Sequence, residues 1–218
     1  LVPVRGTDRI RVGETELLIY YGEPSPFNAA QEIYIEFVPE RTHVESGIWT
    51  FRFLGTGDEE TAADLWLPSA AAVGRDTEFL ESSPDTTLTI PSTAFRPVTV
   101  GAYDSGTGIY APFSGRGDTR VYRAQKPDLA APGGGIMAPD RDGGYSPVTG
   151  TSFAAPLVTG AAALLMEWGI VRENDPYLYG EKVKAYLRKG ARRLPSELAY
   201  PNPRLGYGAL CVADSLPK

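Results

Sequence analysis

A serine placed between a glycine and a run of small residues is the part of this 218-residue chain most suited to chemistry. Ser152 follows Gly150 and Thr151 and precedes an apolar stretch that we expect to form a buried helix over 153–168. Unpaired N–H groups and positive potential at a helix start can stabilise an oxyanion. Serine also favours that position as a plain N-cap, so the residues alone leave a nucleophile and a cap both open.

A nucleophilic serine needs a base, and the chain offers one histidine. His43 lies in the polar stretch 40–45, where we expect an exposed loop histidine rather than a catalytic one. The single cysteine excludes an intrachain disulfide framework. The base for Ser152 is therefore not expected among these residues.

The elements that must position Ser152 are expected in residues 81–218. Apolar runs at 98–102 and 126–133 predict buried strands, and apolar spacing predicts a second helix over about 177–194. We expect Pro156 to lie in the first turn of the serine helix and Gly169 to end that helix. We expect Gly160 and the alanines 161–163 to pack that helix closely on the strands.

Residues 1–80 show a different pattern. Four runs rich in β-branched and aromatic residues predict short strands: 15–21, 32–38, 47–53 and 63–67. Glycines and prolines separate them, which is typical of an antiparallel β-sandwich. The predicted fold class is therefore α/β over 81–218, preceded by an all-β segment over 1–80.

The net charge and hydropathy of the chain exclude some classes of binding partner. The net charge of −6 argues against nucleic acid and against an anionic membrane surface. No uninterrupted apolar run approaches the roughly 20 residues of a membrane span. Because the chain starts at Leu1, we expect it to be a piece of a longer protein.

Four segments together resemble a known family. Residues 150–156 resemble the Gly-Thr-Ser-x-Ala-Ala-Pro nucleophile motif of the subtilisin-like serine proteases, the subtilases. Residues 113–117 match that family's Phe-Ser-x-x-Gly turn, and 126–133 match its Lys-Pro-Asp-x-x-Ala-Pro-Gly segment. Residues 91–102 are similar to its strand after the oxyanion asparagine. The order of these motifs identifies the chain as the C-terminal part of a subtilase core.

The all-β start resembles the jelly-roll insert of the clostridial germination-type (Csp-like) subtilases. This resemblance implies a bacterial protein connected with spore germination. It leaves the compartment open between cytoplasm, spore and secretion.

The resemblance also implies roles for particular residues. Ser152 would form an acyl-enzyme with a peptide substrate, and Gly150 would allow the substrate to approach closely. The Thr151 hydroxyl would supplement the oxyanion hole, although bonding within its own turn explains it equally well. Thr89 would lie near the specificity pocket.

The family's triad Asp, triad His and oxyanion Asn have no counterpart in these residues. We therefore expect the fragment alone to be inactive. We also expect an exposed apolar face on the side of the sheet that the serine helix does not cover, where a missing N-terminal part or a second copy would pack. Two alternatives stay open: a non-catalytic pseudoprotease, and a protein- or glycan-binding role for the jelly roll.

No cofactor is implied. The carboxylates of Asp118, Asp128, Asp140 and Asp142 could bind structural calcium, but they lack an EF-hand spacing. Calcium is therefore an open expectation without a supporting pattern.

Overall fold

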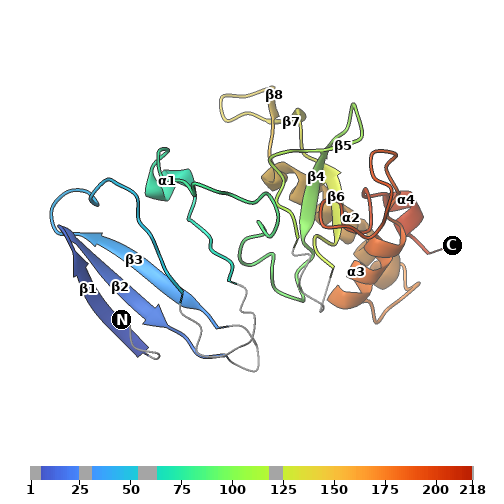
Figure 1. Ribbon diagram of the computed structural model, residues 1–218. Helices are drawn as coiled ribbons and strands as arrows, with labels where there is room; N and C mark the ends of the chain where they lie inside the picture. Colours follow the sequence, from blue (N-terminus) through green and yellow to red (C-terminus); the bar gives the residue numbers. More distant parts are fainter. Residues whose placement is uncertain (1–5, 25–30, 54–62, 118–124, 218) are drawn as a thin grey trace. The chain divides into compact units, whose positions relative to one another are not determined.

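The computed structural model describes residues 6–24, 31–53, 63–117 and 125–217 (Figure 1). The chain divides into two compact units, Leu1–Ala62 and Ala63–Lys218. The division falls before the boundary near residue 80 that the sequence suggests. The indole of Trp66 explains part of this difference, because its Nε1 donates to the Thr86 carbonyl at 2.7 Å and ties residues before 80 to the second unit.

The first unit contains a three-stranded antiparallel sheet of β1 (Gly6–Val12), β2 (Thr15–Tyr21) and β3 (Ile33–Pro39), in that order. Alternate residues of β2, Thr15, Leu17 and Ile19, are buried, as the period of two in a strand requires. The predicted strands 15–21 and 32–38 are confirmed, and β1 was not predicted.

Two other predicted strands are wrong. Residues 47–53 and 63–67 are not part of any strand, although both stretches are described. Phe37 of β3 packs edge-on against Trp49 and Phe51, with ring centroids 5.0 and 6.1 Å away. The alternating side chains of 47–53 thus bury aromatic surface without backbone pairing. A closed jelly roll over 1–80 stays a prediction.

The second unit is built on a sheet with the order β5-β4-β6. Strand β4 (Val100–Asp104) is parallel to β6 (Leu129–Pro132) and antiparallel to β5 (Ile109–Tyr110). The predicted strands at 98–102 and 126–133 are therefore confirmed. A hairpin of β7 (Ile136–Pro139) and β8 (Tyr145–Val148) leads from β6 to the serine helix. On the far side of β6, Ala130 forms a parallel bridge with Ala209.

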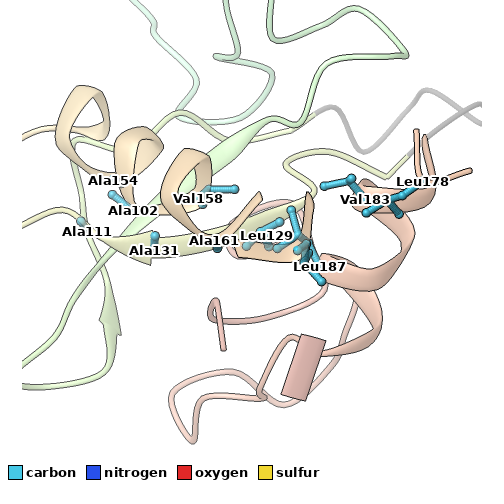
Figure 2. Close-up of a cluster of buried hydrophobic side chains, with 11 residues drawn as sticks. Ala102, Ala111, Leu129, Ala131, Ala154, Val158, Ala161, Leu178, Val183 and Leu187 are labelled. Carbon is cyan, nitrogen blue, oxygen red and sulfur yellow. The ribbon is translucent and has the colours of Figure 1, made fainter. Parts of the chain in front are cut away.

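Helix α2 (Thr151–Met166) lies across β4 and β6 and continues as a π-helical turn, η1 (Glu167–Val171). Helix α3 (Gly180–Lys189) and the short α4 (Val212–Ser215) complete the second unit. Figure 2 shows the core in which Ala154, Val158 and Ala161 of α2 face strand residues that include Ala102 and Leu129. Leu187 of α3 joins this core.

Helix α3 is shorter than the predicted span of 177–194. The chain leaves the helix after Lys189, and Arg192 then exchanges two 2.8 Å backbone hydrogen bonds with Ala209. Gly169, expected to end the serine helix, instead lies buried within η1.

We expected α2 to be a buried helix, and this holds for one face only, because its outer face is exposed. A Cβ added at Gly160 would meet no atom within 4 Å, which contradicts the expected close packing at that residue. Several large apolar residues of the two helical segments are exposed: Leu157, Leu164 and Met166 in α2, and Ile170 and Val171 in η1. The apolar face expected on the uncovered side of the sheet stays a prediction, because these residues belong to α2 and η1 and not to the sheet.

The stretch Thr151–Val171 is long and apolar enough to cross a membrane by length and composition, with a mean hydropathy of 1.5. A core helix passes the same test, and the buried residues of α2 pack on the sheet.

A buried ionic cluster joins β4, β6 and α3. The Asp128 carboxylate accepts hydrogen bonds from the Thr99 amide at 2.6 Å and from Lys126 Nζ at 3.0 Å. It also forms ion pairs with Lys184 Nζ, at 3.2 Å, and with Arg188. Burial lowers the pKa of Lys126, and the bond to Asp128 opposes that change. Three cationic side chains thus surround one carboxylate.

Candidate active site

Ser152 is the second residue of α2 and is exposed. Its neighbour Gly150 is the N-cap, with a φ of 150° that few residues other than glycine adopt. The Gly150 amide donates to the Gly133 carbonyl at 2.8 Å, and the Phe153 amide donates to the Gly150 carbonyl at 3.1 Å. The end of β6 therefore fixes where the helix begins. The predicted position of Ser152 at the start of this helix is confirmed.

The helix begins two residues earlier than predicted, because Gly150 and not a side-chain cap makes the turn into it. Pro156 is consequently the sixth residue of α2 rather than part of its first turn. Proline has no N–H, so it cannot donate the usual helical bond to the Ser152 carbonyl. The backbone around Ser152 thus keeps an acceptor without its usual partner, in addition to the unpaired amides of the first turn.

A cavity of about 450 Å³ brings together two of the predicted site residues, Thr89 and Thr151, which are far apart in sequence. Gly150 and Ser152 adjoin Thr151 in the chain but do not line the cavity. Hydroxyl groups and apolar side chains form most of its wall. The complete lining is Pro84, Thr87, Leu88, Thr89, Ser92, Thr99, Val100, Tyr110, Pro112, Phe113, Ser114, Gly115, Arg116 and Thr151.

The turn at 113–117 forms one wall and is anchored to the sheet. Ser114 Oγ accepts a 2.9 Å hydrogen bond from the Ala102 amide, and the Tyr110 hydroxyl donates to the Ser114 carbonyl. The turn therefore stands at a fixed place beside β4.

Arg116 brings a charge into this wall. Its guanidinium lies 5.3 Å from the centre of the Tyr110 ring, and its NH1 lies 3.3 Å from Asp85 Oδ1. Interaction with Tyr110, and then with Asp85, raises the pKa of Arg116, so the group stays cationic. Arg116 was not predicted as a site residue: it occupies a variable position of the Phe-Ser-x-x-Gly turn, and that motif was the signal that could have identified it.

His43 lies in the first unit, where it is exposed and its Nδ1 is 3.0 Å from the Thr42 hydroxyl. The second unit, which contains Ser152, has no histidine in its sequence. The prediction that His43 is an exposed loop residue is confirmed.

The carboxylates considered for calcium do not come together in the described residues. Asp128 is occupied by the ionic cluster, and Asp140 and Asp142 lie exposed at the β7–β8 turn. Asp118 lies outside the described residues. Within the described part of the chain, no group of three or more His, Cys, Asp or Glu side chains could hold a metal ion.

Comparison with known proteins adds an independent line of evidence. The sequence profile of the subtilase family, peptidase S8, matches residues 61–208. Serine protease AprX of Bacillus subtilis (strain 168) is 32% identical over 158 residues, which cover 62% of this chain and 33% of AprX. The membrane-bound transcription factor site-1 protease of Mus musculus is 36% identical over 114 residues, 50% of this chain and 10% of that protein.

Among solved structures, the Clostridium perfringens CspB protease matches with a TM-score of 0.81 and 37% identity. The match covers 97% of this chain and 44% of the CspB chain. The chain therefore spans less than half the length of these relatives.

Proposed function

The chain belongs to the subtilase family, and on that premise we propose that it is the C-terminal part of a serine endopeptidase whose nucleophile is Ser152. The observation that carries this proposal is the exposed position of Ser152 in the first turn of α2, set by the bond between Gly150 and Gly133. The resemblance to CspB over nearly the whole chain supports the same assignment.

In the proposed reaction, Ser152 Oγ attacks the scissile carbonyl and transfers its proton to a general base. The carbonyl oxygen becomes an oxyanion, which unpaired amides at the start of α2 stabilise. Collapse of this intermediate expels the amine, which takes the proton, and leaves an acyl-enzyme that water hydrolyses. Since the unit that carries Ser152 has no histidine, we propose that the base comes from outside residues 1–218.

The cavity beside Thr151 is the proposed site for a substrate side chain. Thr89 and Arg116 are its polar determinants, and Phe113 gives it an apolar surface. The exposed row on α2 is proposed to pack against the part of the protein that supplies the base, or against a second copy of this chain. The resemblance to CspB favours a bacterial protease acting in spore germination.

The test is covalent labelling of the full-length protein with a fluorophosphonate probe. Ser152 should carry the label, and Ser152→Ala should lose both the label and peptide hydrolysis. Ser105→Ala, at an exposed turn of the same unit, is the matched control and should keep both. Labelling that survives in Ser152→Ala would show that another residue is the nucleophile.

Comparing residues 1–218 alone with the full-length protein tests whether the general base lies outside these residues. Residues 1–218 alone should react poorly with the probe, because an unassisted hydroxyl is a weak nucleophile. Strong labelling of this fragment would contradict a base from outside it. If the full-length protein also fails to react while it is folded, the pseudoprotease alternative holds.

A further inference from the structure

A second cavity, of about 410 Å³, is lined by residues at the end of α3 and beyond it. It shares no residue with the cavity beside Thr151. Basic and aromatic side chains dominate its wall, and no acidic side chain from the described parts of the chain lines it. The lining residues are Arg188, Lys189, Ala191, Arg193, Tyr200, Pro201 and Tyr207.

The charge behind this wall is unbalanced. The only carboxylate that binds Arg188 among the described residues is Asp128, which also binds Lys126 and Lys184. One negative charge thus compensates three positive charges in a buried setting. Because uncompensated charge is costly away from water, the cluster favours an anion at the side where Arg188 reaches the cavity.

Donors in the wall are also unused. Behind the wall, Arg188 Nε is buried and has no hydrogen-bond partner in the described structure. Lys189 and Arg193 form no ion pair with any other described residue. Arg188 lies over the Tyr207 ring, 4.8 Å from its centre, and this stacking holds the guanidinium plane in place. A fixed guanidinium with two flanking cations matches the geometry of a phosphate group.

We propose that this cavity binds a phosphate group, independently of the function proposed for Ser152. Three cations with no acidic side chain in the wall suit a dianion better than a single carboxylate. The phosphate can belong to a small molecule or to a phosphorylated peptide, since both present the same oxygens to Arg188, Lys189 and Arg193.

Calorimetric titration of the full-length protein with inorganic phosphate, at constant ionic strength adjusted with chloride, tests the proposal. We expect saturable binding that the double variant Lys189→Gln/Arg193→Gln weakens by about tenfold or more. Both side chains are exposed and make no described ion pair, so the variant should fold, which circular dichroism checks.

The matched control is Arg96→Gln/Arg172→Gln, which removes the same charge at exposed residues outside the cavity and should bind phosphate as the unmodified protein does. Absence of saturable binding, or equal weakening in both double variants, would overturn the proposal. A phosphoserine peptide titrated in parallel distinguishes the sources: tighter binding than inorganic phosphate indicates a phosphorylated protein, and equal or weaker binding indicates a small molecule.

Discussion

Replacing Gly133 by alanine should damage both the stability of the core and the placement of Ser152. A Cβ on Gly133 would lie 2.6 Å from the Ala102 Cβ and 3.2 Å from the Gly150 carbonyl oxygen. Carbon atoms in contact prefer about 3.5–4.0 Å, so something must move by about 1 Å. Ala102 is fully buried and cannot yield easily, and we expect the overpacking to cost about 1–3 kcal/mol of unfolding free energy.

The same substitution affects Ser152, the proposed nucleophile, through the backbone. The Gly133 carbonyl accepts the hydrogen bond from the Gly150 amide that sets the start of α2. If Gly133 moves, Gly150 moves with it, and so does Ser152, two residues further along the chain. A misplacement of about 1 Å at a reacting group can lower kcat by about 100-fold. Urea unfolding and kcat for peptide hydrolysis, both in the full-length protein, measure the two effects.

Gly160→Ala is the matched control, because its new methyl group meets no atom and an exposed helical glycine costs about 0.5–1 kcal/mol relative to alanine. It should leave kcat unchanged and should not lower stability. An unchanged unfolding free energy in Gly133→Ala would refute the predicted clash with Ala102. Lost stability with unchanged kcat would refute the connection from Gly133 to Ser152.

Three further outcomes follow from buried and charged groups. Asp128→Asn leaves three cations without their carboxylate and should lower the unfolding free energy in urea by about 3–5 kcal/mol; an unchanged value would contradict this. Leu187→Ala, in the core, should lower the unfolding free energy by about 2–5 kcal/mol in the same assay. Leu164→Ala, at an exposed residue, should lower it by about 0.5 kcal/mol or less, so equal losses would be inconsistent with the packing. The hydrogen bond from the Thr107 amide lowers the pKa of Asp104, so the ionised Asp104 carboxylate stabilises the fold above the ordinary pKa of 3.8, and this stabilisation is lost as the pH falls. Asp104→Asn should therefore make acid unfolding less pH-dependent. An identical acid unfolding profile would show that this turn does not contribute.

The two buried strands of the second unit were predictable from sequence because they are mostly apolar along their length. Strand β4 nevertheless begins at Val100 rather than at residue 98, since the Thr99 amide donates to the distant Asp128 carboxylate and not to a neighbouring strand. Such a partner, 29 residues away, leaves no trace in local hydrophobic spacing.

The errors in the first unit have a different cause. Alternation at 47–53 correctly indicated that one side of the segment is buried, but side-chain packing against Phe37 does not require backbone hydrogen bonds to a neighbouring strand.

The exposed face of α2, in the second unit, could not be predicted for another reason. Apolar composition does not distinguish a buried face from an exposed one, because Val158 and Leu157 are equally apolar.

The candidate site was only partly predictable. The motif resemblance placed Thr89 and Thr151 near the substrate, and one cavity contains both. The basic cavity could not be predicted, because Lys189 and Arg193 look like an ordinary solvated helix face in sequence. They line a common cavity because α3 ends at Lys189 and the chain turns back toward Ala209.

The bridge between Ala130 and Ala209 has a consequence for the time course of folding. Strand β6 pairs with β4 on one side, about 30 residues earlier in the chain, and with the segment around Ala209 on the other, almost 80 residues later. Because contacts between distant residues slow folding, and synthesis releases the N-terminal partner first, β6 keeps one open edge until the segment around Ala209 has been synthesised. Pairing of the Ala209 segment is therefore the last step in forming this sheet, and a chain that stalls before it exposes an unpaired strand edge to aggregation.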